Sequence, residues 1–196
     1  MKSHNQQGFT LIEMVIVVAL LGILAAVALP RMLNVTEQAE DATVEGVMGG
    51  FATGVGLVRA QWEVDGRPAQ NVAAGITMIE IDGVQVGVDQ NTGYPTGIAQ
   101  GSTEDTAMDA ADCQAIFSLI MQSAPTISAS WADKPFNDYR YFTRVNQGAA
   151  SGGNDLCYYY LTRTVKNNTQ EPVDNSAGNG FYYDPRIGQV FFFSNN

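Results

Sequence analysis

The stretch GFTLIEMVIVVALLGILAAVALP, residues 8–30, decides the fold of this chain because it is apolar over the thickness of a membrane. A helix over residues 9–29 would be roughly 31 Å long, which spans the hydrocarbon core of a bilayer. Its one charged side chain is Glu13, and a carboxylate inside a membrane costs about 2.5–3.5 kcal/mol unless it has a partner. We therefore interpret this helix as one that leaves the membrane and packs against copies of itself.

A short polar leader, residues 1–8, precedes the apolar helix and carries Lys2 as its only lysine or arginine. Lys2 and the starting amine predict that the leader stays in the cytoplasm and that residues after Pro30 lie outside. The alternative is an ordinary secretory signal, because Ala26-Val27-Ala28 fits a small-x-small cleavage site. Two features argue against that alternative. Glu13 places a charge within the apolar stretch, and the helical pattern continues past Leu29 instead of breaking there.

The residues resemble the N-terminus of type IV prepilins, in which the run from residue 8 to residue 13 precedes an apolar helix. The stretch PRMLNV, residues 30–35, resembles more narrowly the mannose-sensitive haemagglutinin (MSHA) pilins. The resemblance implies a single-pass inner-membrane precursor in a Gram-negative bacterium, which is then assembled into an extracellular pilus. The implied partners are other pilin subunits in a homopolymer, a prepilin peptidase, an inner-membrane platform with its motor ATPase, and host or surface glycans.

The resemblance also assigns roles to individual residues. It implies that a prepilin peptidase cuts between Gly8 and Phe9 and that the new Phe9 amine is N-methylated. It implies that Glu13 attracts the Phe9 amine of a neighbouring subunit during assembly. Gly22 and Pro30 match positions at which pilin helices loosen or bend.

Electrostatics supports the pairing of Glu13 independently. Removal of the leader would create a positive amine four residues before this carboxylate, at one end of an apolar helix. Opposite charges attract strongly in a low-dielectric bundle, although the desolvation of both offsets much of the gain. We interpret the pair as a device that sets the register between subunits; the alternative is a Glu13 solvated at the headgroup boundary.

After residue 30 the helix becomes amphipathic and is expected to end near residue 63. Apolar residues recur there at intervals of three and four and mark one buried face: Val44, Val47, Met48, Phe51, Val55, Val58 and Trp62. The expected organisation is a leader (1–8), a transmembrane and filament-core helix (9–29) and a globular domain (30–196) that includes the amphipathic half of the helix (about 30–63).

The rest of the chain predicts one more helix and several strands. Residues 76–88 predict a hairpin that turns at an Asp-Gly pair, residues 82–83. A helix is expected over 106–123, with Ser102 and Asp105 as a capping box. Runs rich in Tyr, Phe, Thr and Val predict further strands at 139–145, 156–165, 181–184 and 189–194. The expected fold class is α+β, a type IV pilin fold with an antiparallel sheet packed on the long helix.

Two cysteines, Cys113 and Cys157, are present. A domain outside the inner membrane meets oxidising conditions, so we expect the two to form a disulfide. The alternative is a pair of free structural thiols.

The composition disfavours a catalytic site and disfavours binding to nucleic acid. The formal net charge is −10, with 20 acidic and 10 basic residues, which disfavours a grip on nucleic acid. The only histidine, His4, lies in the leader, so histidine-based catalytic and metal sites are not expected in the mature chain. We expect no catalytic residue, no cofactor and no metal; calcium near Asp89 and Asn91 is a weak alternative to the use of these residues in a turn.

The sequence is thus interpreted as a structural subunit, major or accessory, of an MSHA-type type IV pilus for surface attachment. One alternative is a pseudopilin of type II secretion, which shares the N-terminus. A remote alternative is a secreted enzyme with an ordinary signal peptide, which would need an active site without histidine.

The substitution Glu13→Ala tests the role given to this carboxylate. We expect the variant to insert into the membrane as the wild type does, because the apolar helix is unchanged, but to form no polymer. Membrane fractionation and electron microscopy of sheared fibres measure the two properties. Normal fibres from the variant would contradict the pairing.

Overall fold

The computed structural model describes residues 9–99 and 101–195 of the chain. Internal contacts divide it into two compact units, one ending at Glu40 and the other comprising Asp41–Asn196. The second unit combines helices with two mainly antiparallel sheets, which makes the fold α+β as expected.

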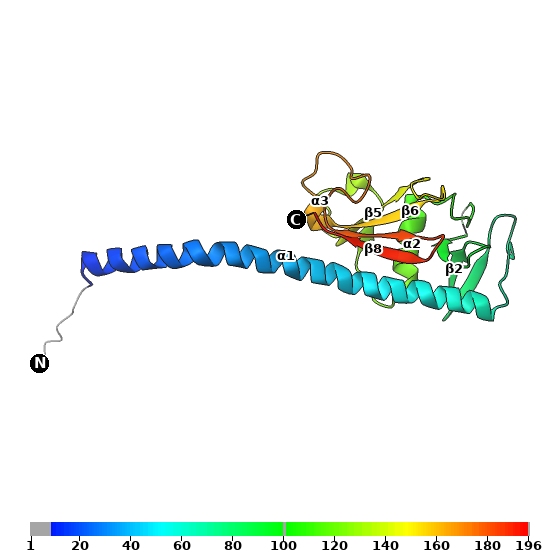
Figure 1. Ribbon diagram of the computed structural model, residues 1–196, viewed down its shortest axis with the longest axis horizontal. Coiled ribbons are helices and arrows are strands. Elements are labelled where there is room, and N and C mark those ends of the chain that lie inside the picture. Colours follow the sequence, from blue (N-terminus) through cyan, green and yellow to red (C-terminus); the bar gives the residue numbers. More distant parts are fainter. Residues whose placement is uncertain (1–8, 100, 196) are drawn as a thin grey trace, which may run out of the picture. The chain divides into compact units, whose positions relative to one another are not determined.

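The first element, helix α1 (Leu11–Val64), runs through both units (Figure 1). It ends within a residue of the expected position, where Gly66 takes a positive φ of 83° that glycine adopts without strain. The part of α1 after Asp41 has the expected buried face: Val44, Phe51, Gly54, Val55, Val58 and Trp62 are buried.

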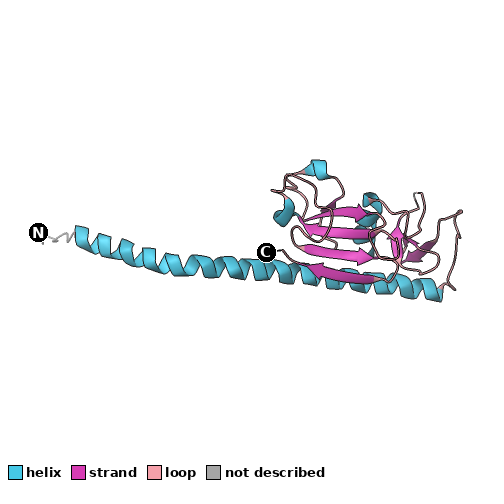
Figure 2. Cartoon of the chain, turned by 45° about the horizontal axis from the view of Figure 1, so that its top comes forward, coloured by secondary structure: helices cyan, strands magenta, loops and turns pink. Residues whose placement is uncertain are grey.

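Strands in the second unit form two sheets (Figure 2). The smaller sheet, in the order β1-β2-β3, contains the predicted hairpin and pairs its strands antiparallel. The larger has the order β4-β5-β6-β7-β8; its neighbours are antiparallel except for β4 and β5, which are parallel. The strands are β1 (Met78–Ile81), β2 (Val84–Val88), β3 (Pro95–Gly97), β4 (Ile127–Ser128), β5 (Tyr141–Asn146), β6 (Leu156–Leu161), β7 (Gly180–Asp184) and β8 (Gln189–Phe193).

The main core lies between one face of the larger sheet and two helices, α1 and α2 (Ala110–Ile120). Phe51 of α1 is central: its ring lies 5.2 Å from that of Tyr159, 5.5 Å from Phe181 and 5.4 Å from Tyr183. Phe117 of α2 adds a second ring, 5.2 Å from Tyr159. Alternate residues of β6 and β7 therefore point to the helices, as strand geometry requires.

The opposite face of the larger sheet is buried too. Phe142, Tyr160 and Phe193 form a second cluster there, which is covered by the segment around the 3₁₀ turn Trp131–Asp133 and by helix α3 (Thr162–Val165). Because both faces are covered, all six residues of β6 are buried. This explains why β6 reads as a continuous run of aromatic and aliphatic residues instead of an alternating one.

Helix α2 begins later than predicted, and its expected cap was wrong. The helix starts at Ala110 rather than at residue 106, with Asp109 and Asp112 as a reciprocal capping box. Desolvation raises the pKa of the buried Asp112 carboxyl to about 6. The expected pair lies too early in the chain to cap this helix, since even Asp105 stands before the N-cap Asp109. The Asp105 carboxylate is instead paired with Arg186, 2.7 Å from Nε and 3.0 Å from a second guanidinium nitrogen.

The predicted strand 156–165 was also too long. Strand β6 ends at Leu161, and the next residues form α3. The ladders to β5 and β7 stop at Leu161 and Tyr160, so a longer strand would have no neighbour. The Thr162 hydroxyl turns back and donates to the carbonyl oxygens of Tyr139 and Arg140, 2.8 and 3.0 Å away.

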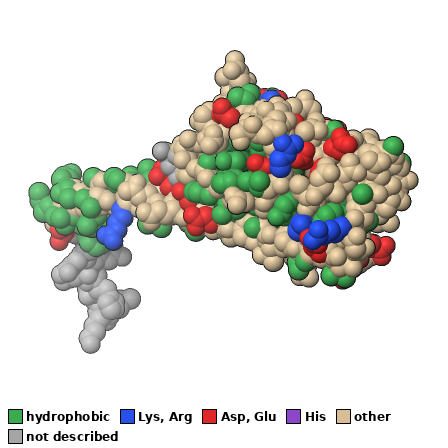
Figure 3. Space-filling model, turned by 45° about the vertical axis from the view of Figure 1, so that its right-hand side comes forward, with side chains coloured by type: hydrophobic (Ala, Val, Ile, Leu, Met, Phe, Trp, Pro, Cys, Tyr) green, Lys and Arg blue, Asp and Glu red, His purple; other side chains and the backbone are tan. Residues whose placement is uncertain are grey.

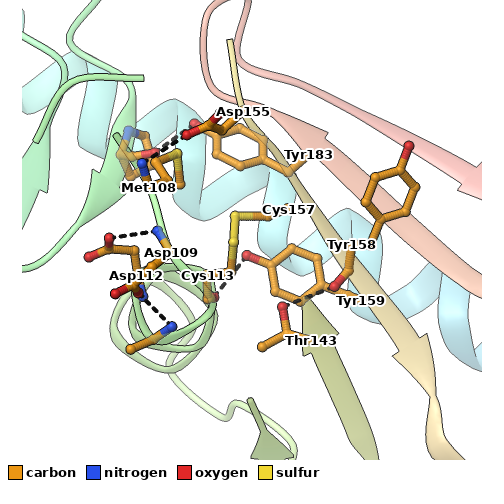
Figure 4. The surroundings of a disulfide bond; sticks show 12 residues. Met108, Asp109, Asp112, Cys113, Thr143, Asp155, Cys157, Tyr158, Tyr159 and Tyr183 are labelled. Atoms are coloured by element: carbon orange, nitrogen blue, oxygen red, sulfur yellow. Dashed lines mark hydrogen bonds between the residues drawn. A yellow bond between two sulfur atoms is a disulfide. The ribbon is translucent and has the colours of Figure 1, made fainter. Parts of the chain in front are cut away.

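A disulfide joins Cys113 of α2 to Cys157 of β6 (Figure 4). Both residues are completely buried, and their Cα atoms lie 5.5 Å apart. Beside it the Tyr159 hydroxyl donates to the Cys113 carbonyl oxygen at 2.9 Å. The bond therefore fixes α2 against the middle of the sheet.

Replacement of both cysteines, Cys113→Ala with Cys157→Ala, tests how much the bridge contributes. Closing a loop with a sequence separation of 44 residues stabilises a fold by about 4 kcal/mol in the chain-entropy model. We expect urea denaturation in detergent, followed by tryptophan fluorescence, to show a lower midpoint in the double variant. Reduced wild-type protein should match it, and an unchanged midpoint in both would contradict the prediction.

Candidate assembly site

The apolar segment, residues 14–29, is fully exposed in the single chain. Within residues 9–99 and 101–195, α1 is the one helix long and apolar enough to cross a membrane by length and composition, and its most apolar 18-residue window is 0% buried. Leu24 and Val27, for example, are 67% and 73% exposed. Hydrophobic side chains gather over this part of the molecule in the space-filling view (Figure 3). Such a surface needs lipid or protein around it.

Glu13 lies at the start of this helix and closes a capping box with Thr10. Its Oε2 accepts hydrogen bonds from the Thr10 backbone N–H at 2.8 Å and from the Thr10 hydroxyl at 2.7 Å. The Thr10 hydroxyl in turn accepts the Glu13 N–H at 3.3 Å. Thr10 is therefore the N-cap of α1, and Glu13 occupies the third helical position that reciprocal capping requires.

Sequence reasoning missed Thr10 as part of the site. The signal was present, because a threonine followed three residues later by a glutamate before an apolar run is the capping-box pattern. The cap holds one carboxylate oxygen of Glu13 in a fixed place at the helix end. A carboxylate has about four acceptor positions, so capping leaves room for a further donor such as an amine.

The other predicted assembly residues lie on the same helix or just before it. Phe9 precedes α1 and is 83% exposed, whereas Gly8 lies outside the described residues. Gly22 is exposed, with nothing within 4 Å of a Cβ built on it. Pro30 lies inside α1, where it removes one helical hydrogen-bond donor. The sites of cleavage, methylation and bending thus remain predictions.

Asp89 and Asn91, the weak calcium candidates, form a tight turn. Asp89 is buried, and its Oδ1 accepts the N–H groups of Asn91 and Thr92, each at 2.9 Å. Its Oδ2 faces the Asp105 N–H at 3.3 Å. In the part of the chain that the structure describes, no group of three or more His, Cys, Asp or Glu side chains is placed to hold a metal ion. The hydrogen bonds from Asn91 and Thr92 show that the Asp89 carboxylate stabilises the turn, which is the use predicted for it.

The N-terminal part of the chain matches a known protein family. The prokaryotic N-terminal methylation motif matches residues 3–29, which include the predicted cleavage site and the whole apolar segment. No solved structure matches the chain significantly.

Several curated proteins are similar to part of this chain. The type IV narrow pilus major component PilA5 of Thermus thermophilus is 51% identical over 39 residues, which are 20% of this chain and 34% of that protein. Fimbrial protein EcpC of Eikenella corrodens is 40% identical over 77 residues, 39% and 48% of the two chains. The type II secretion system core protein G of Pseudomonas aeruginosa is 36% identical over 59 residues, 30% and 42% of the two chains.

The chain thus matches about a third to a half of the length of these relatives. Their names describe fibre components and a secretion-system component, and not enzymes. The α+β arrangement of the described residues is consistent with a type IV pilin fold, in which the later part of a long apolar helix packs on a sheet. The methylation motif and the fimbrial relatives support a type IV prepilin.

Two substitutions separate the helix-capping role of Glu13 from the role of its negative charge. Glu13→Gln keeps a side-chain acceptor for the cap but removes the charge, whereas Thr10→Ala removes the cap at a cost of about 1 kcal/mol and keeps the charge. We expect Glu13→Gln to lose polymer and Thr10→Ala to retain it, measured as pelletable subunit. The reverse order would show that capping, and not charge, is what assembly needs.

Proposed function

We propose that this protein is a structural subunit of an extracellular type IV pilus of the MSHA type, used for surface attachment. The observation that carries the proposal is the exposed, charge-free segment 14–29 of α1, which lies within the match to the methylation motif, residues 3–29. The later part of α1 belongs to the core of a globular domain. A chain built this way suits a subunit that is stored in a membrane and then packed into a fibre.

The mechanism is mechanical. A prepilin peptidase removes residues 1–8, and the new amine of Phe9 is methylated. The apolar segment holds the subunit in the inner membrane until a platform and its motor ATPase transfer it to the base of the fibre. There Glu13, already fixed by its cap, meets the Phe9 amine of a neighbour in a low-dielectric bundle and sets the register.

Attachment to surfaces or glycans rests on the MSHA resemblance of residues 30–35. The acidic balance of the chain, with a formal net charge of −10, suits a protein displayed outside a cell because it favours solubility. The fibre subunit itself needs no bound cofactor for the role proposed here.

A second candidate function is a type II secretion pseudopilin. The similarity to core protein G of Pseudomonas aeruginosa favours it, because that relative matches 30% of this chain. The two functions differ in where the polymer stands, since a pilus extends from the cell surface. Immunogold labelling of intact cells with antibody to the globular domain separates them: we expect labelled surface fibres.

The N-terminus of the mature protein tests the maturation steps. We expect intact-mass and N-terminal peptide spectra to give a chain that begins at Phe9 and carries one extra methyl group. Deletion of the peptidase gene should restore the full-length, unmethylated mass and provides the control. A chain that begins near Leu29 would instead indicate a secreted protein and contradict the proposal.

A further inference from the structure

An apolar groove follows the exposed side of α1 within the unit Asp41–Asn196. Its walls are the later part of α1 and the end of α2 with the loop after it, and its volume is about 640 Å³. A second hollow of about 350 Å³ continues it toward the β1–β2 hairpin and shares Gly54, Leu57 and Ile120 with it. We call the two hollows together the α1–α2 groove.

Three glycines at four-residue intervals shape this groove. A Cβ on Gly54 would lie 2.5 Å from the carbonyl oxygen of Ile120, so glycine is what allows the end of α2 to lie against α1. Gly46 and Gly50 differ, because nothing lies within 4 Å of a Cβ built on either and both are exposed. The groove is therefore open above Gly46 and Gly50, where the backbone of another helix could approach closely.

Charged side chains are nearly absent from the lining. The single charged lining residue is Asp82, which belongs to the second hollow beside the hairpin. Leu57, shared by both hollows, is 60% exposed, so apolar surface faces water in the single chain. A chain with a formal net charge of −10 that keeps such a surface uncharged is suited to an apolar partner.

We propose that the α1–α2 groove of one copy receives the apolar segment, residues 14–29, of a second copy. This inference rests on the proposed function and names the surface on which assembly occurs. The segment has the character that the groove requires: it is helical, it has no charge to bury, and Leu20, for example, is 57% exposed. Outside the membrane it must be covered, and an uncharged groove covers it without leaving a buried charge unpaired.

Filling the groove tests the proposal without disturbing the fold. Gly50 lines the open part of the groove, and a Cβ built there has nothing within 4 Å, so the leucine of Gly50→Leu extends into open space. Leucine is also a better helix former than glycine. We expect at least tenfold less pelletable polymer than in the wild type, with unchanged circular dichroism and an intact disulfide. Wild-type amounts of polymer from Gly50→Leu would overturn the proposal.

Gly56→Leu is the matched control. Gly56 is also exposed and has nothing within 4 Å of a Cβ, but it does not line the groove. It points about 120° away from Gly50 around the helix axis. Because both substitutions change helix propensity equally, we expect Gly56→Leu to polymerise as the wild type does; equal loss in both variants would overturn the proposal.

Cross-linking identifies the occupant. Polymer from a mixture of ¹⁵N-labelled and unlabelled Gly50→Cys subunits is treated with a short cysteine-to-C–H photo-cross-linker and analysed by mass spectrometry. We expect links from residue 50 of one copy to peptides within residues 14–29 of the other. Links only to globular-domain peptides, to lipid or to an unrelated protein would overturn the inference.

Different results would contradict the proposed function and the assignment of the groove. If wild-type protein forms no polymer, the proposed function itself is wrong. If the wild type polymerises through a Glu13-dependent step and Gly50→Leu polymerises equally well, only the groove assignment is wrong.

Discussion

Apolar surface must be covered, and α1 carries more of it than its own chain can cover. After Asp41 the helix buries Phe51, Val55 and Val58 against the sheets and α2. Over residues 14–29 it leaves every side chain exposed. The hydrophobic effect therefore stabilises one end of α1 within the subunit and requires lipid or other subunits at the other. This difference makes the helix suitable for transfer from a membrane to a fibre.

The part of α1 after Asp41 packs tightly around Phe51. Four aromatic rings surround its side chain at 5.2–6.2 Å, and the disulfide fixes α2 behind them. Asp41, where the second unit begins, accepts hydrogen bonds from Asn179, which precedes β7, and from Ser194, which follows β8, so the ends of both strands are tied to the same helix. The globular unit therefore has a close-packed core of its own.

At the N-terminus one carboxylate caps the helix and is the group for which we propose a role in assembly. Glu13 satisfies donors at the start of the helix, which would otherwise be unpaired in an apolar environment. The same cap fixes the position of its charge, so that a neighbour's amine would meet a preorganised acceptor. Preorganisation reduces the entropy lost on docking, which fits the interpretation of this pair as a register device.

The sequence by itself determined the elements that depend on local residue patterns. The charge-free run 14–29, the three- and four-residue spacing from Val44 to Trp62 and the Asp-Gly turn at 82–83 each act within a few residues, and each predicted its element correctly. The tertiary structure decided what depends on residues far apart in the chain. Asp105 pairs with Arg186 while Asp109 and Asp112 cap α2, β6 stops where its ladders to β5 and β7 stop, and the end of α2 lies against α1 because Gly54 has no Cβ. Spacing along a chain carries no record of such partners, since they meet only when the chain is folded.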